Sequence, residues 1–105
     1  MLRTLTLVAV MLSSVVISGG HGEAADIAAG HKKASRCAVC HGANGISVTP
    51  DAPNLAGQNE AYLASELTQF HTGARQNEIM NMMAKPLTDA DIANLAAYYH
   101  SLSAK

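Results

Sequence analysis

The two cysteines of the 105-residue chain, Cys37 and Cys40, are separated by two residues, and His41 follows at once. This Cys-x-x-Cys-His pattern is typical of covalent haem attachment. Two intervening residues let both thiols reach the two vinyl groups of one porphyrin. The next residue then lies beneath the iron, where its Nε2 can serve as an axial ligand. The motif predicts one haem c, attached through two thioether bonds, with His41 on the metal.

Three other uses of such a cysteine pair fit this sequence less well. A structural zinc site needs four ligands, and the chain has no second cysteine pair. A thioredoxin-type dithiol is expected beside a βαβ unit, whereas no segment shows the alternating pattern of a strand. A structural disulfide across two residues gives His41 no role. Haem attachment alone uses all three residues.

The composition of the chain also favours a bound prosthetic group that completes the core. The length suits one small domain, and aromatic residues make up 4% of the chain, with no tryptophan. So short a chain has little apolar bulk with which to build a core unaided. Seven basic residues against eight acidic ones, without a run of like charge, give no electrostatic footprint for nucleic acid.

The N-terminal residues are typical of a secretory signal peptide. Arg3 supplies a positive start, residues 5–17 are almost wholly apolar, and small residues lead to Ala24. The apolar run is shorter than the roughly twenty residues of a comfortable membrane span. We therefore expect a signal peptide at 1–24, a mature domain at 25–105 without a membrane span, and a periplasmic location.

The mature domain is predicted to be all-α. Helices are expected over 26–35, 59–72 and 88–102, while 42–58 and 74–87 show the irregular composition of loops. Gly73 marks the end of the second helix, and Thr88 with Asp91 resembles a capping box at the start of the third. The residues expected to face inward are Ile27, Ala28 and Ala34 in the first helix, Tyr62, Leu63, Leu67 and Phe70 in the second, and Ile92, Leu95, Ala96, Tyr99 and Leu102 in the third.

These features resemble the small bacterial class I cytochromes c over nearly the whole mature chain. The matching residues are Gly30, Cys37 to His41, Pro53-Asn54-Leu55-Ala56-Gly57-Gln58, a methionine before Leu87-Thr88-Asp89, and the Ala-Ala-Tyr of the last helix. The resemblance implies a cytochrome c fold, in which three main helices and their loops wrap one covalent haem. It also implies that the first and last helices cross where Gly30 meets Tyr98 or Tyr99.

The iron needs a sixth ligand besides His41. The mature chain offers Met80, Met82, Met83, His31, His71 and His100. Three thioethers within four residues of a segment expected to be non-helical favour methionine, although methionine is also a common gap-filler. The resemblance implies Met80, the earlier member of a Met-x-x-Met pair before the final helix, with Met83 as the alternative. His71 and His100 lie near helix C-termini, where an imidazolium interacts well with exposed carbonyls, and His31 is expected to be solvated.

Further contacts follow from the same resemblance. Pro53, twelve residues after His41, matches the position whose carbonyl accepts the second ring proton of the ligating histidine; the alternative is a simple turn former. Leu55, Leu67 and Ile92 or Leu95 would line the haem edge. Gln58, Arg75 and Asn77 are candidates to bind a propionate, or else ordinary surface residues.

The resemblance implies a periplasmic one-electron carrier that is not itself an enzyme. The alternative is a haem c electron-accepting subunit of a periplasmic dehydrogenase. A ligand sensor with an open sixth position is disfavoured by the methionine cluster. Expected partners are redox proteins, met through the basic residues Lys32, Lys33 and Arg36, and the expected state is a monomer or weak oligomer.

Overall fold

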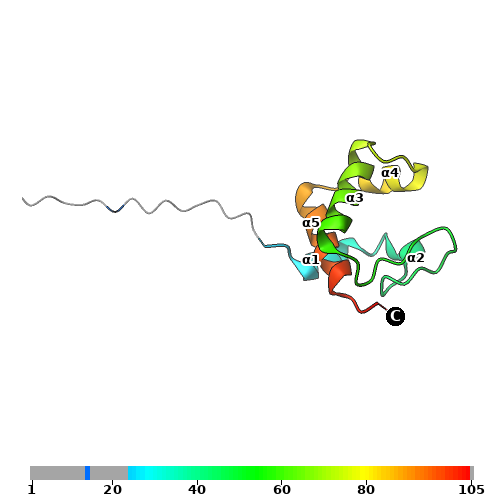
Figure 1. Cartoon of the computed structure of the whole chain (residues 1–105), viewed down its shortest axis with the longest axis horizontal. Helices are drawn as coiled ribbons and strands as arrows, with labels where there is room; N and C mark the ends of the chain where they lie inside the picture. The colour runs from blue at the N-terminus through cyan, green and yellow to red at the C-terminus, as the bar shows by residue number, and fades with distance from the viewer. Residues whose placement is uncertain (1–13, 15–23, 105) are drawn as a thin grey trace, which may run out of the picture.

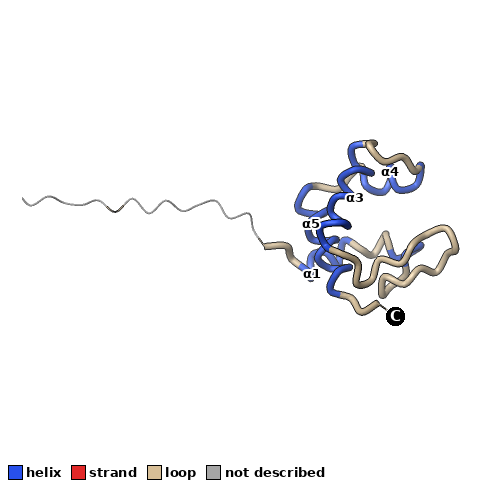
Figure 2. The backbone as a smooth tube through the Cα atoms, viewed as in Figure 1, coloured by secondary structure: helices blue, strands red, loops and turns tan. Residues whose placement is uncertain are grey.

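The computed structural model describes Ser14 and residues 24–104, and the regular elements of this part are helices (Figures 1 and 2). They are α1 (Ile27–Lys33), α2 (Ala38–His41), α3 (Glu60–Thr72), α4 (Glu78–Ala84) and α5 (Asp89–Ser101). The predicted all-α class is confirmed. Apart from Ser14 and Ala24, the expected signal peptide lies outside the described residues. Within that described part, none of the helices combines the length and the apolar character that a membrane crossing requires.

Helices α1 and α5 cross at Gly30. A Cβ atom placed on Gly30 would lie 2.9 Å from the Cβ of Tyr98 and would overlap the backbone carbonyl of Asn94. The predicted contact between Gly30 and a tyrosine of the last helix is therefore present, and the tyrosine is Tyr98. Asn94 adds a second contact between the two helices, because its Oδ1 accepts a hydrogen bond from the backbone N–H of Asp26, the N-cap of α1, at 2.8 Å.

The inward face of α1 differs from the prediction. Gly30 and Ala34, one turn apart, are buried, but Ile27 is 49% exposed and Ala28 is also exposed. Ala28 precedes Gly30 by two residues, about 200° around the helix, so it points to the opposite side. Ile27 lies in the first turn, ahead of the crossing with α5. The predicted inward positions of these two residues are wrong, and that of Ala34 is confirmed.

Helix α3 packs on α5 and completes the core. The buried cluster consists of Ala34, Leu63, Leu95, Ala96, Tyr98 and Tyr99. Asn59 caps α3 by accepting from the N–H of Tyr62, and Gly73 ends it in the left-handed conformation at φ 84°. Thr88 and Asp91 form the predicted capping box of α5. Tyr62, predicted to face inward, is 50% exposed.

The segment before α5 contains a helix that the sequence did not indicate. Residues 74–87 were expected to be irregular, yet α4 occupies Glu78–Ala84, with Asn77 as its cap. The side chain of Asn77 accepts from the N–H of Met80 at 2.9 Å. Seven residues are too few for hydrophobic periodicity to be recognised. Among the described helices, α4 contacts α3 alone.

The long connection between α2 and α3 is a loop, as predicted. It folds back on itself, because the carbonyl of Gly45 accepts hydrogen bonds from the N–H groups of Leu55 and Ala56 at 2.8 and 3.0 Å. The N–H of Gly57 then donates to the carbonyl of Tyr99 at 2.9 Å and ties the loop to α5. This arrangement places Pro53 opposite His41.

Candidate functional site

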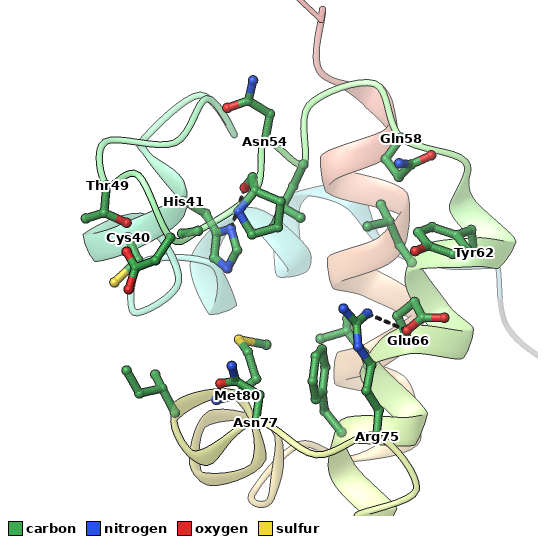
Figure 3. A pocket seen from close by; sticks show the side chains of 18 residues that line it. Cys40, His41, Thr49, Asn54, Gln58, Tyr62, Glu66, Arg75, Asn77 and Met80 are labelled. Atoms are coloured by element: carbon green, nitrogen blue, oxygen red, sulfur yellow. Dashed lines mark hydrogen bonds and ion pairs between the residues drawn. The ribbon is translucent and has the colours of Figure 1, made fainter.

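A cavity of about 360 Å³ opens between the 42–58 loop with α2 on one side and α3 with α4 on the other (Figure 3). Its lining includes residues predicted for the site: Cys40, His41, Pro53, Leu55, Gln58, Leu67, Arg75, Asn77 and Met80. Its volume falls within the range of ligand sites in proteins. The tertiary structure thus brings together residues spread over forty positions of the chain.

His41 presents one ring nitrogen to this cavity. The side chain is 7% exposed, and its Nδ1 lies 2.8 Å from the carbonyl oxygen of Pro53. Because a carbonyl can only accept, Nδ1–H is the donor of this hydrogen bond. In Figure 3 the ring points across the cavity toward Met80. With Nδ1 engaged by Pro53, Nε2 is the ring nitrogen left to bind a metal.

The two thiols line two adjoining cavities. Cys40 lines the main cavity, and Cys37 lines a neighbouring cavity of about 120 Å³. Met80 and Leu67 line both cavities, which therefore share a wall. The N–H of His41 donates to the carbonyl of Cys37 at 2.9 Å and fixes the turn that presents all three motif residues. Burial raises the pKa of the Cys37 thiol, so the free thiol is uncharged at neutral pH.

The three methionines of α4 have different surroundings. Met80 faces the main cavity, Met83 lines only the smaller one, and Met82 is 66% exposed. Met80 is therefore the methionine that shares a cavity with His41. The expectation that these methionines lie in a non-helical segment is wrong, because α4 carries all three.

The other candidate ligands are engaged elsewhere. His71 Nδ1 donates to the carbonyl of Ala84 at 2.9 Å, and His100 Nδ1 donates to that of Gln58 at 2.7 Å. Each imidazole therefore binds a carbonyl of another segment, not one at the end of its own helix as expected. His31 is exposed, as predicted, and stacks on Tyr98 with a centroid separation of 4.9 Å. None of the three lines either cavity.

The apolar and polar walls match the sequence predictions in part. Leu55 and Leu67 line the main cavity, but Ile92 and Leu95 are buried away from it, because their face of α5 packs into the core. The three residues proposed to bind a propionate, Gln58, Arg75 and Asn77, all lie at the cavity.

Arg75 makes an ion pair and a cation–π contact that were not predicted from the sequence. Its guanidinium pairs with the Glu66 carboxylate at 2.5 Å and lies over the Phe70 ring, 4.6 Å from the centroid (Figure 3). Glu66 and Arg75 are nine positions apart and on different elements, so no local pattern links them. The pair places one cation and one anion at the rim of the cavity.

The donor set fits a haem iron. An imidazole nitrogen and a thioether sulfur face one cavity, one thiol lines it, the other lines the adjoining cavity, and most of the nearby wall is apolar. Thr49 also lines the cavity. Its hydroxyl oxygen and that of Tyr99 are buried without a hydrogen-bond partner among the described residues.

Comparison with known families agrees with this geometry. The family model described as Cytochrome c matches residues 27–103. A protein named cytochrome c-554(548), from Halomonas halodenitrificans, is 43% identical over 81 residues, which cover 74% of this chain and 98% of that protein.

Two longer proteins match over part of their length. The crystal structure of reduced recombinant cytochrome c4 from Pseudomonas stutzeri superposes with a TM-score of 0.72 at 37% identity, covering 76% of this chain and 47% of that one. A thiosulfate dehydrogenase electron acceptor from Thiomonas intermedia is 48% identical over 77 residues, 71% of this chain and 35% of that protein. The chain thus spans half or less of each of these two relatives.

Proposed function

The chain belongs to the cytochrome c family, and from this premise we propose that it is a periplasmic one-electron carrier and not itself an enzyme. It holds one haem c through Cys37 and Cys40. The observation that carries the proposal is the placement of His41 and Met80 on facing walls of one cavity, with Cys40 in its lining and Cys37 in the lining of the adjoining cavity.

The haem supplies one-electron cycling of its iron, and the protein residues set the conditions for it. His41 provides Nε2 on one side, with its tautomer fixed by the carbonyl of Pro53. Met80 would offer its thioether as the second protein ligand, and a histidine and methionine pair raises the reduction potential. Leu55 and Leu67 keep the nearby wall apolar, while Arg75 offers a cation to a propionate.

A permanent electron-accepting subunit is the second candidate. It is supported by the relative named thiosulfate dehydrogenase electron acceptor. It is also supported by apolar side chains on the elements that border the cavity: Val39 is 72% exposed, Val48 68%, Ile79 56% and Met82 66%. A lasting contact would require these side chains to form one contiguous patch, since apolar residues exposed singly are common on protein surfaces. The case for docking through Lys32, Lys33 and Arg36 is weaker than the sequence suggested. Lys33 Nζ lies 3.5 Å from the carboxylate of Asp91, which offsets its positive charge.

Expression of the whole chain in a bacterial host that matures haem c tests the main proposal. We expect a red protein in the periplasmic fraction, with haem that survives acid-acetone extraction and a spectrum of six-coordinate iron. Cys37→Ala and Cys40→Ala should each yield little folded protein, because the haem completes the core. A colourless and fully folded wild-type protein would refute the proposal.

Affinity purification from the native periplasm separates the two candidates. A carrier is recovered alone, since its complexes are brief and small, often under about 1,200 Å². A subunit is recovered with a dehydrogenase at a fixed ratio that persists in high salt. Val39→Ser with Met82→Ser should abolish that co-purification and leave a free carrier unchanged.

A further inference from the structure

The side chain of Asn81 connects three backbone groups around α4. Its Nδ2 donates to the carbonyl of Phe70 at 2.9 Å and to the carbonyl of Arg75 at 2.8 Å. Its Oδ1 accepts from the N–H of Asn77 at 2.8 Å. Two acceptors and one donor surround the amide, so only one orientation satisfies all three.

Helix α4 has few other contacts that fix its position. It is seven residues long, and in isolation so short a helix is not stable in water. Of its residues only Ala84 is fully buried, while Ile79 and Met82 are more than half exposed. Since α3 is the single helix that it touches in the described part of the chain, its position depends on bonds to α3 and to the loop that joins them.

Two of these bonds are reciprocal between the helices. Asn81 of α4 satisfies the carbonyl of Phe70 in the last turn of α3, and His71 of α3 satisfies the carbonyl of Ala84 at the end of α4. Carbonyls in a last helical turn lack partners within their own helix. The Phe70 carbonyl receives the Asn81 amide, and the Ala84 carbonyl receives His71 in addition to the N–H of Leu87, at 3.1 Å. Together they restrain α4 at two points, one turn apart.

We propose that Asn81 is a positioning residue that locks α4 in the orientation that presents Met80 to the haem iron. The inference rests on the proposed role of Met80 as the sixth ligand. Adjacent residues of a helix differ by about 100° around its axis, so fixing Asn81 toward α3 also fixes the direction of Met80. The lock lowers the fraction of time in which α4 swings away and the iron is open to an external ligand.

Imidazole binding to the ferric, haem-loaded protein measures this open fraction. Asn81→Leu keeps the size of the side chain and removes all three hydrogen bonds. We expect imidazole to bind roughly ten- to a hundredfold faster, as the loss of a few hydrogen bonds of ordinary strength would produce. Hydrogen exchange of the α4 amides should accelerate as well, with that of α5 unchanged.

Gln76→Ala is the matched control. Gln76 belongs to the same loop, and its amide donates only to the Gly73 carbonyl of that loop, at 3.0 Å. We expect wild-type imidazole binding and α4 exchange from this variant. If Asn81→Leu does not fold, Asn81→Asp serves instead, because it keeps the shape and the oxygen that accepts from Asn77 while losing both donors.

Met80→Ala distinguishes the two ways in which the proposal can fail. If Met80→Ala loses the sulfur-to-iron charge-transfer band while the Asn81 variant binds imidazole and exchanges like wild type, the lock is refuted and the ligand assignment stands. If Met80→Ala keeps the band, the ligand assignment fails and the proposal falls with it. Faster binding and faster α4 exchange in the Asn81 variant, together with loss of the band in Met80→Ala, support the lock.

Discussion

Gly30 and Tyr98 lie so close that a Cβ on the glycine would be 2.9 Å from the Cβ of the tyrosine. The contact joins the first helix of the described domain to the last, across 68 residues of sequence. Cys37 follows α1 by four residues and packs against the core cluster that includes Tyr98. The position of the attachment motif therefore depends on the crossing of α1 with α5.

Gly30→Ala should destabilise the haem-loaded protein by about 1–2 kcal/mol. Alanine gains up to ~1 kcal/mol over glycine within a helix, but the added methyl group overpacks the crossing, which costs about 1–3 kcal/mol. Denaturant unfolding followed by the haem spectrum measures the difference. Ala28→Ser on the exposed side of α1 is the control, expected within about 0.5 kcal/mol of wild type. Equal or higher stability of Gly30→Ala would show that the two helices can separate at no cost.

Met80→Ala should abolish the near-infrared sulfur-to-iron band of the oxidised protein, open the sixth coordination site and lower the potential. Met83→Ala should keep the band, because Met83 lines only the smaller cavity. Absorption spectra and potentiometric titration of both variants check this. The reverse pattern, with the band lost in Met83→Ala alone, would reassign the ligand.

Pro53→Ala should leave the iron–histidine bond nearly unchanged, because the hydrogen bond to His41 uses the backbone carbonyl and not the ring. Stability should fall by about 0.4–1 kcal/mol, since alanine restores conformational freedom to the unfolded chain. Resonance Raman measurement of the ferrous iron–histidine stretch, together with denaturant unfolding, tests both parts. A large shift of the stretch would mean that the ring itself holds the carbonyl in place.

The capping box of α5 should contribute a pH-dependent part of the stability. The hydrogen bond from the Thr88 N–H is the main cause that lowers the pKa of Asp91. A carboxyl with a lowered folded-state pKa stabilises the fold above its unfolded value, near 3.9, and loses this contribution as the pH falls through the folded value. Asp91→Asn should therefore have a lower free energy of unfolding than wild type at pH 5–7, and the difference between the two proteins should shrink below about pH 4.

Two further variants identify the source of that effect. Thr88→Ala removes the other half of the box and should cost about 1 kcal/mol. Lys33→Gln removes the ion pair with Asp91 and leaves the box intact. Unfolding curves from pH 3 to pH 7 should show a clear loss for Thr88→Ala and little change for Lys33→Gln. A pH profile of Lys33→Gln that matched Asp91→Asn would assign the effect to the ion pair.

The attachment motif and the three longest expected helical segments could be predicted from local sequence patterns. The Cys-x-x-Cys-His spacing is a local pattern, because two intervening residues let both thiols reach one porphyrin and the next residue reach its iron. The starts of α3 and α5 and the end of α3 were also predictable, since Asn59, Thr88 and Gly73 act on backbone groups within a few residues of themselves. The resemblance to class I cytochromes c placed a helix crossing at Gly30, and the crossing is present, with Tyr98 as the partner.

Which side chains line the cavity depends on how whole helices pack. Helix α4 carries the three methionines, and it is too short to be recognised from hydrophobic periodicity. It is held in place by Asn81 and His71, whose hydrogen-bond partners lie up to thirteen residues away in the sequence. The pairing of Arg75 with Glu66 and the exposure of Ile27 likewise depend on how helices pack. Contacts of this kind follow from the relative placement of whole elements, which composition and spacing along a single chain do not specify.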